Sequence, residues 1–299
     1  YQCGLQAAQP TPAKPRAIPG SLDAAAIGYL DSQAFRTLRD TTQTHYRRVI
    51  DDLRGDHGTK PLRLLDATGV RRVLEAKKGR PAAMNRRLRM LRLILAWARE
   101  HGLIDHDPAR DVARAREPGR GFRPWDEEHI AQFRARHPSG TPARLALELL
   151  LNTGQRRSDV VRMGRQHVSA GVLRIRQSKT GEAVEVPILP ELHTELDQVP
   201  AGQLTFLVTV RGGGHTSAGF YQWFQDRCAE AELPAGLAPH GLRKACGRRL
   251  AEAGCTALQI MAVLGHRTLQ EAQKYIDDYN RTAAARQAIV KLRRVKRGT

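Results

Sequence analysis

Six side chains in this sequence have the chemistry needed to handle a phosphate ester. Two are arginines, one is a lysine, two are histidines and one is a tyrosine. They belong to the segments Thr153-Gly154-Gln155-Arg156, Ser178-Lys179-Thr180-Gly181, Pro239-His240-Gly241-Leu242-Arg243 and Leu264-Gly265-His266, and the tyrosine follows nine residues after the last of these. The six are Arg156, Lys179, His240, Arg243, His266 and Tyr275.

Together these residue types can cleave a phosphodiester without a metal ion. The planar fork of an arginine binds a phosphate through two parallel hydrogen bonds and offsets its charge. In the pentacoordinate transition state, negative charge grows on the non-bridging oxygens, so pre-placed guanidinium and imidazole donors stabilise it more than the ground state. A tyrosine hydroxyl can form a covalent intermediate that conserves the bond for rejoining. A lysine can give the departing 5′ oxygen its proton.

The local sequence predicts how three of these side chains are presented. Arg156 follows a Thr-Gly turn at the start of a helix, where free backbone N–H groups also favour an anion. His240 and Arg243 are three positions apart in a helix that begins near Pro239. This spacing places both side chains on one helix face.

The other three lie near turns or helix ends. Lys179 is expected at the tip of a β-hairpin, where neighbouring arginines lower its pKa and suit it to proton donation. His266 follows a glycine that ends a helix, which leaves the imidazole free to bind the phosphate or the tyrosine. Tyr275 is expected in a short helix beginning near Thr268, with its phenol activated by the surrounding cations. Tyr279, four residues further on, is the rival nucleophile.

Each of these residues also fits a purely structural role when taken alone. Arginine pairs, a turn lysine and a polar His-Arg pair are common on solvated surfaces. A histidine at a helix end can interact with the helix dipole, and a tyrosine can pack its ring in the core with its hydroxyl in water. The order and spacing of the whole set favour a site over six separate surface features.

The charge of the chain favours a polyanionic partner. Among 299 residues, 49 are Lys or Arg and 30 are Asp or Glu, which gives a formal net charge of +19. Clustered cations are rewarded by phosphate neutralisation and counterion release, so nucleic acid is the expected partner. The alternative is a GC-rich genome that favours arginine codons.

Composition also limits the other classes of protein. Four scattered cysteines (Cys3, Cys228, Cys246 and Cys255) fit neither a disulfide framework nor a CxxC metal site and indicate a reducing compartment. No run of about 18 apolar residues predicts a membrane span, and the first twenty residues carry no signal-peptide core. We expect a bacterial cytoplasmic protein that acts at the nucleoid.

The hydrophobic pattern predicts a mainly α protein with a small antiparallel β-sheet (α+β). Aromatic residues make up only 5% of the chain, so a Leu-, Ala- and Val-rich helical core is expected. Alternation over Val172–Arg176 and Val184–Ile188 predicts a hairpin, and Leu204–Val210 is predicted as a third strand. Everything from Ser217 onward is expected to be helical.

Five segments are expected along the chain. Residues 1–20 are Pro-rich and read as an extended linker. Residues 21–114 are expected to form a small helical domain, and residues 115–124 a basic interdomain linker. Residues 125–290 are expected to form a second domain that carries the six candidate residues, and residues 291–299 a basic, loosely held tail.

The order Arg, Lys, His-x-x-Arg, His and Tyr resembles that of the tyrosine recombinase (phage integrase) family of site-specific integrases, over roughly residues 20–290. The resemblance implies that Arg156 and Arg243 clamp the scissile phosphate and that Lys179 is the general acid. It assigns acid–base transfer to His240, support of the phosphate to His266, and a 3′-phosphotyrosyl link to Tyr275. The chain departs from the family's usual pattern at three positions. Gln155 stands where an apolar residue is usual, Asp159 where Glu is common, and Asp277 where many members have His.

The resemblance implies that residues 1–20 are the remnant of an upstream arm-binding domain, that residues 21–114 are a helical, SAM-like core-binding (DNA-binding) domain, and that residues 125–290 are a catalytic domain of the DNA breaking-rejoining type.

The resemblance also implies partners and biology. The partner is double-stranded DNA carrying attachment sites, and no metal or nucleotide cofactor is needed. The protein acts as a homo-tetramer on two duplexes through a Holliday junction, with DNA-bending accessory proteins as further partners. Integration or excision of a prophage or mobile element is the leading expectation.

Four alternatives remain open at this point. Xer-like resolution of chromosome dimers uses the same chemistry, and so does a type IB topoisomerase. A catalytically silent DNA-binding protein could use the same scaffold. A metal-dependent nuclease would need a ligand cluster, and the sequence contains none.

Overall fold

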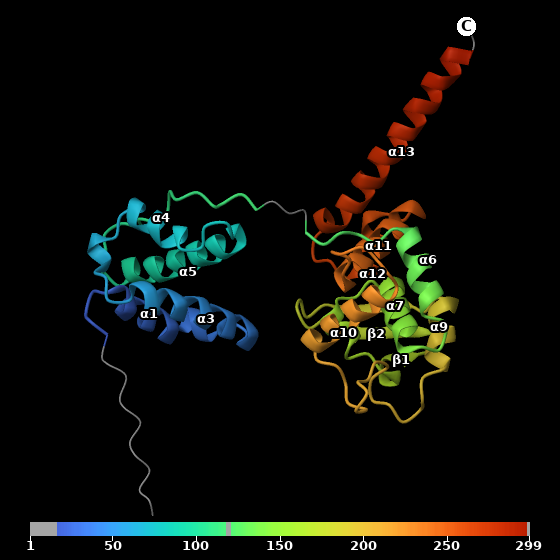
Figure 1. The fold of residues 1–299 in the computed structure, drawn as a ribbon, viewed down its shortest axis with the longest axis horizontal. Helices are drawn as coiled ribbons and strands as arrows, with labels where there is room; N and C mark the ends of the chain where they lie inside the picture. Colours follow the sequence, from blue (N-terminus) through green and yellow to red (C-terminus); the bar gives the residue numbers. More distant parts are fainter. Residues whose placement is uncertain (1–16, 118–120, 298–299) are drawn as a thin grey trace, which may run out of the picture. The chain divides into compact units, whose positions relative to one another are not determined.

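The computed structural model describes residues 17–117 and 121–297, and these divide into two compact units, one on each side of residues 119 and 120. The Pro-rich residues 1–16, the middle of the expected linker and the last two residues of the expected tail lie outside the described residues. Helices dominate both units, and one small sheet lies in the second unit, as the α+β prediction requires (Figure 1).

The first unit is entirely helical over its described residues. Its helices are α1 (Leu22–Asp31), α2 (Gln33–Arg36), α3 (Asp40–His57), α4 (Ala67–Glu75) and α5 (Pro81–Glu100), with a 3-10 turn η1 (Leu62–Leu64). Asp66 caps α4 by accepting from Gly69 N at 2.6 Å. Helix α5 ends at His101 and Gly102, whose φ of 68° is the left-handed conformation expected of a C′ glycine.

The core of the first unit lies between α1, α3 and α5. Leu91, Ile94 and Leu95 of α5 are completely buried, as are Ile50 and Leu53 of α3. These positions recur at three- and four-residue steps, so the apolar stripe read from the sequence is the face that packs.

The second unit combines eight helices with the sheet among its described residues. The helices are α6 (Glu127–Arg136), α7 (Pro142–Thr153), α8 (Arg157–Val160), α9 (Pro190–Asp197), α10 (Ser217–Glu230), α11 (Pro239–Glu252), α12 (Ala257–Leu264) and α13 (Leu269–Arg297), with a 3-10 turn η2 (Arg165–His167). Helix α11 packs against α7, α12 and α13, and α12 also packs against the sheet. Helix α11 therefore connects the elements that carry the six candidate residues.

The sheet has three antiparallel strands in the order β1 (Val168–Ser169), β2 (Val172–Arg176) and β3 (Ala183–Pro187). The predicted hairpin is β2–β3, with Leu173 opposite Val186 and Ile175 opposite Val184. These four side chains are buried, and the alternate ones are exposed except for the half-buried Val172. The alternation fixes the register because a shift by one residue would turn the apolar side chains to solvent.

The predicted third strand over Leu204–Val210 is wrong. The third strand is β1, and the 204–210 segment is a loop with a single bridge from Val208 to Gly214. Consecutive residues Phe206 and Leu207 are both buried, whereas a strand on one sheet face buries alternate residues. Burial of this adjacent pair anchors the loop without strand pairing.

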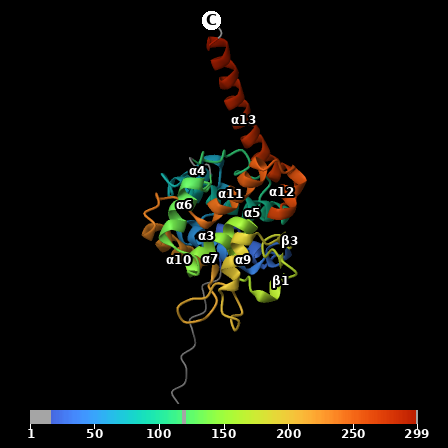
Figure 2. The same ribbon diagram turned by 90° about the vertical axis from the view of Figure 1, so that its right-hand side faces the viewer.

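Helix α13 is much longer than the short helix expected around Tyr275. It runs for 29 residues, through the segment expected to be a loosely held tail. In both views its distal half extends away from the other elements of the second unit (Figure 1; Figure 2). Tyr275 lies in its first two turns, where α13 still packs on α11 and α12.

Both described ends of the expected linker are held by hydrogen bonds. Asn85 donates to Ala115 O at 2.9 Å and accepts from Ala115 N at 2.8 Å. On the other side, Trp125 Nε1 donates to Ala238 O at 3.1 Å, and Lys244 Nζ donates to Phe122 O at 2.6 Å. Residues 121–125 therefore pack against the start of α11.

The aromatic centre of the second unit gives a stability prediction. Phe133 is completely buried, with its ring stacked on that of Phe224 at 5.4 Å between centroids and edge-on to that of Trp125 at 5.6 Å. Phe133→Ala should lower the free energy of unfolding by about 3–5 kcal/mol, because it removes a large core side chain and leaves a cavity. Denaturant unfolding followed by tryptophan fluorescence measures the change.

The control for this prediction is Leu204→Ala, since Leu204 is 85% exposed. It should change the free energy of unfolding by no more than about 0.5 kcal/mol. Equal losses for the two variants would contradict the burial of Phe133.

Candidate functional site

Arg156 lies at the junction of α7 and α8, as the N-cap residue of α8. The preceding Gly154 adopts a φ of 61° and ends α7, so the chain turns sharply before the arginine. The half-buried guanidinium donates from Nη1 to Gln177 Oε1 at 2.5 Å. Helix α8 has only four residues, so the expected anion-binding helix start is a single turn and the arginine carries the charge of this position.

Arg243 is the most deeply buried of the six residues. It is 3% exposed, and its Nη1 donates to Gly154 O at 2.8 Å. Burial, followed by the positive charge of Arg156, lowers its pKa to about 10. A guanidinium with this pKa is still charged at neutral pH, and the negative charge of a phosphate bound near it would oppose both effects and raise the pKa again.

His240 lies one helical turn before Arg243 on α11, as its three-residue spacing predicted. The residue is exposed, but its ring lies 4.9 Å from that of Phe122, which shields part of the imidazole. Desolvation of the ring comes first among the causes that lower its pKa to about 4, followed by the charges of Arg243, Lys244, Arg156 and Lys179. The imidazole is therefore neutral at pH 7.

Tyr275 and His266 face each other across the α12–α13 connection. Their rings are parallel within 4°, with centroids 6.1 Å apart. Gly265 ends α12 with a φ of 63°, which confirms the predicted tight turn before His266. Burial, followed by the charges of Arg243 and other residues, lowers the pKa of His266 to about 4, and its buried Nδ1 has no hydrogen-bond partner among the described residues.

Arg243 acts on the phenol of Tyr275 in the expected direction, but in the free protein burial outweighs this effect. Burial raises the pKa of Tyr275, and the lowering effect of Arg243 is smaller. The ring also lies tightly against α11, where a Cβ added to Gly247 would come within 2.6 Å of it. The phenol is thus protonated at neutral pH and needs a base or a bound substrate to become a nucleophile.

Lys179 lies in the loop between β2 and β3, where the sequence placed it. It is exposed, and no hydrogen bond or ion pair of its ammonium is found within residues 17–117 and 121–297. Its charge nevertheless acts on His240. Lys179 therefore borders the same site from the side of the sheet.

Electrostatic coupling shows that the six residues come together in the second unit. The charges of Arg156, Lys179 and Arg243 act on the pKa of His240. The charges of Arg156 and Arg243 act on the pKa of His266, and the charge of Arg243 also acts on that of Tyr275. The six residues thus lie close together, although they come from α8, α11, α12, α13 and the β2–β3 loop.

Tyr279, the rival nucleophile, lies one turn further along α13. It is 36% exposed, whereas Tyr275 is half-buried beside His266. The geometry favours Tyr275.

Two buried residues at this site make more hydrogen bonds to its elements than the sequence predicted. Gln177 is 1% exposed and accepts from Arg156, while Asp159 is completely buried and accepts from Ser178 N at 2.8 Å and Ser178 Oγ at 2.7 Å. The register of β2 contained a signal for Gln177, because it continues the buried alternation of Leu173 and Ile175. For Asp159 the signals were its place three residues after Arg156 and the Glu that the family more often has there.

Neither arginine of the site is paired with a carboxylate. Among the described residues, no Asp or Glu oxygen lies within ion-pair distance of Arg156 or Arg243, and the two arginines donate instead to an amide oxygen and a backbone carbonyl. Within the same residues, no group of three or more His, Cys, Asp and Glu is arranged to hold a metal ion. The site therefore offers positive charge that no direct ion pair neutralises, and the buried Asp159 acts on Arg243 only from beyond ion-pair distance.

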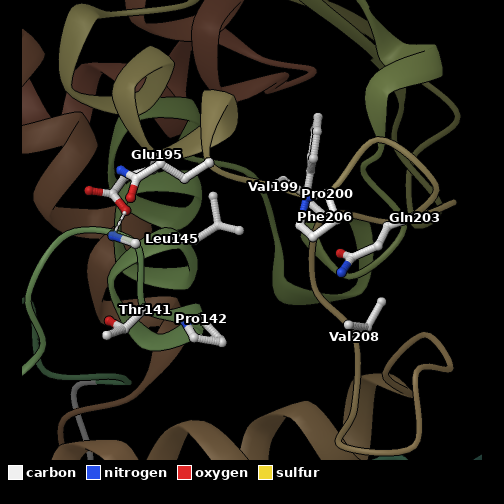
Figure 3. Close-up of a pocket in the computed structure, with 11 residues that line it drawn as sticks. Thr141, Pro142, Leu145, Glu195, Val199, Pro200, Gln203, Phe206 and Val208 are labelled. Carbon is white, nitrogen blue, oxygen red and sulfur yellow. Dashed lines mark hydrogen bonds between the residues drawn. The ribbon is translucent and has the colours of Figure 1, made fainter.

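A separate hollow lies elsewhere in the second unit, between the start of α7, the end of α9 and the loop that follows it. Figure 3 shows Leu145, Phe206 and Val208 lining it, with Glu195 accepting from the backbone of Gly140 at 3.0 Å. None of the six residues lines this hollow, so it does not belong to the candidate site.

A match to a protein-family model shows which family the chain belongs to. The model described as "Phage integrase family" matches residues 122–281, which is more than half of the chain. The chain belongs to the phage integrase family. The predicted family is thereby confirmed, and with it an enzyme of the tyrosine recombinase type.

Curated relatives carry two kinds of name. Tyrosine recombinase XerD of Ralstonia nicotianae is 28% identical over 207 residues, covering 64% of this chain and 67% of the relative. The integrase of Escherichia phage HK022 is 28% identical over 155 residues, covering 51% of this chain and 43% of the relative. Both kinds of name, recombinase and integrase, denote DNA recombination.

Solved structures support the fold. A lambda integrase dimer bound to a COC′ core site superposes with a TM-score of 0.76 at 24% identity, covering 87% of this chain and 78% of that one. A lambda integrase tetramer bound to a Holliday junction gives 0.73 at 22% identity, covering 83% and 78%. The predicted fold class is confirmed by this match and by the three-stranded sheet among helices.

None of the described helices is both long and apolar enough to cross a bilayer.

The low pKa values at the site predict how stability depends on pH. His266 has a pKa of about 4 in the folded protein and an ordinary value near 6.5 when unfolded. Between these values only the unfolded state binds the proton, so stability is full above pH 6.5 and falls as the pH drops toward 4. This group adds a slope of at most about 1.4 kcal/mol per pH unit.

Denaturant unfolding between pH 7 and pH 4 measures this slope in the wild type and in His266→Gln. The variant should show a shallower loss of stability over this window, because its side chain does not titrate. His193→Gln is the matched control, since His193 is exposed and pairs only with Asp197. Equal slopes for wild type and His266→Gln would contradict the lowered pKa.

Proposed function

We propose that this protein is a site-specific DNA recombinase that cleaves and rejoins DNA through a 3′-phosphotyrosyl intermediate and a Holliday junction. The observation that carries the proposal is the meeting of Arg156, Arg243 and Tyr275 in one site without a paired carboxylate. Such a site suits an anionic ester and a covalent attack on it. Family membership supports the same reaction.

In the proposed cleavage step, Tyr275 Oη attacks the scissile phosphorus. The Oη–P bond forms, the bond from phosphorus to the 5′ oxygen breaks, and the phenolic proton leaves with a base. Lys179 protonates the departing 5′ oxygen, which yields a free 5′ hydroxyl. Rejoining reverses these steps with the 5′ hydroxyl of a partner strand.

The two arginines stabilise the pentacoordinate transition state by donating to its non-bridging oxygens. The charge of Arg243 also lowers the pKa of Tyr275, against the larger effect of burial. His240 is neutral at pH 7 and can take the phenolic proton. His266, also neutral, supports the phosphate through a hydrogen bond without adding a charge that would compete with the arginines.

We assign DNA recognition to both units. The first unit, within residues 21–114, would be the core-binding domain, and residues 125–290 the catalytic domain. The net charge of +19 supports contacts with the backbone of a duplex. The helices of the first unit would supply base contacts in the grooves.

The proposed assembly is a homo-tetramer on two paired attachment sites. The lambda integrase structures, described as a dimer on a core site and a tetramer on a Holliday junction, support this assembly by their likeness in fold. DNA-bending accessory proteins would help to bring the sites together. The protein would act on nucleoid DNA in the bacterial cytoplasm.

Two biological roles are compatible with this chemistry. Integration or excision of a prophage or mobile element is supported by the likeness to phage and transposon integrases. Xer-like dimer resolution is favoured by the XerD and XerC names of several relatives. Sequencing the DNA beside the gene separates them, because direct repeats next to a tRNA gene indicate an attachment site.

The nucleophile prediction concerns Tyr275→Phe. This variant should form no covalent adduct with a nicked suicide duplex while its specific DNA binding stays nearly unchanged, because only the attacking oxygen is removed. SDS gel electrophoresis detects the adduct, and a mobility shift measures binding. Tyr279→Phe is the matched control and should form the adduct normally; loss of the adduct in Tyr279→Phe alone would reassign the nucleophile.

The phosphate-clamp prediction concerns Arg243→Ala. Cleavage should slow by about 100- to 1,000-fold, since one removed phosphate donor costs about 3–4 kcal/mol of transition-state stabilisation. Single-turnover cleavage of the same duplex measures the rate, with Arg248→Ala as a control on the same helix. A rate within about tenfold of wild type would reject the proposed role.

The wild-type reactions separate the other classes of protein. No adduct from the wild type would favour a silent DNA-binding protein. Relaxation of supercoiled DNA that lacks a specific site, at equimolar protein, would favour a topoisomerase. Loss of cleavage in EDTA would favour a metal-dependent nuclease.

A further inference from the structure

Two buried glutamines form a hydrogen-bonded pair behind the candidate site. Gln155 is 0% exposed and Gln177 is 1% exposed. Gln177 Nε2 donates to Gln155 Oε1 at 2.7 Å, and Gln155 Nε2 donates to Val263 O at 2.8 Å. The pair thus joins the α7–α8 junction, the end of β2 and the last turn of α12.

Gln177 uses the full hydrogen-bonding capacity of its amide. Its Nε2 donates to Gln155 Oε1 and, at 2.8 Å, to Leu264 O. Its Oε1 accepts from Arg156 Nη1 at 2.5 Å and from Thr180 Oγ1 at 2.7 Å. An amide has two donors and two acceptor lone pairs, so all four are occupied. A flipped amide would set its NH₂ group against the guanidinium, so the orientation is fixed.

Each partner of Gln177 is next to a residue of the site. Arg156 is itself one of the six, Thr180 follows Lys179, and Leu264 lies two residues before His266. The approach is close because a Cβ at Gly265 would lie 2.3 Å from Gln177 Nε2. One neutral side chain therefore contacts three of the elements that deliver the site.

The neutrality of this acceptor matters for a phosphate-binding arginine. A carboxylate at the same place would orient Arg156 equally well but would neutralise it and repel the substrate. An amide oxygen orients the guanidinium and leaves its charge available. The same principle holds for Arg243, which is oriented by the Gly154 carbonyl.

We infer that Gln177 is a positioning residue that aims Arg156 at the scissile phosphate while leaving the charge of the arginine uncompensated. This inference rests on the proposed function. Gln177 acts through Arg156 and does not touch the reacting atoms. Gln155 holds the amide of Gln177 in the one orientation that presents its oxygen.

The test compares cleavage of two duplexes that differ only at the scissile linkage. One carries the natural phosphate and the other a methylphosphonate, in which a neutral methyl group replaces a charged oxygen. Gln177→Met keeps the side-chain volume and removes all four hydrogen bonds. Gln132→Met is the matched control, because Gln132 also donates to a carbonyl, Ala231 O at 2.8 Å, but outside the site.

With the phosphate duplex, Gln177→Met should cleave about 100-fold more slowly than wild type at saturating DNA, as for a misplaced transition-state donor. With the methylphosphonate duplex the loss should shrink to less than about tenfold, because a neutral linkage depends less on the charge of Arg156. Gln132→Met should match wild type on both. Circular dichroism melting verifies that each variant is folded at the assay temperature.

Gln177→Glu provides a second measurement if Gln177→Met does not fold. It keeps the acceptors for Arg156 but adds a charge, so it should show the same selective loss on the phosphate duplex. Equal losses on the two duplexes, or none, would overturn the inference while leaving the proposed function intact. Absence of an adduct with wild-type protein on the phosphate duplex would overturn the proposed function and the inference with it.

Discussion

The site depends on holding two arginines close together without neutralising them. Arg243 is buried and close enough to Arg156 for their repulsion to lower its pKa. A carboxylate partner would remove this repulsion but would also occupy the donors that a phosphate needs. The fold uses the Gly154 carbonyl and the Gln177 amide instead. The repulsion between the two arginines destabilises the free protein, and the negative charge of a bound phosphate diester offsets it.

Close helix packing makes this arrangement possible. Gly154 and Gly265 end α7 and α12 in left-handed conformations, and side-chain atoms lie within 2.4 Å of where a Cβ would be at each. Gly247 lets the ring of Tyr275 lie against α11. Because three of the elements meet at glycines, the arginines, histidines and tyrosine can approach without a cavity between the helices.

Much of the site could be predicted from the sequence because its residues lie at turns and helix ends. Gly265 before His266 and Pro239 before His240 mark their positions in the chain. Packing and burial could not be read in this way. The raised pKa of Tyr275 and the four contacts of Gln177 depend on neighbours from distant segments. The false strand at Leu204–Val210 has the same cause, since tertiary anchoring overrode β propensity there.

The most direct test of the account is to locate the covalent bond between protein and DNA. The adduct with a suicide duplex is digested with nuclease and trypsin, and the modified peptide is sequenced by mass spectrometry. Cleavage after Lys274 and Arg281 leaves both tyrosines in one peptide, Tyr275–Arg281, so its fragment ions must assign the nucleotide. The account predicts a nucleotide phosphate on Tyr275. A phosphate on Tyr279, or on no tyrosine, would contradict it.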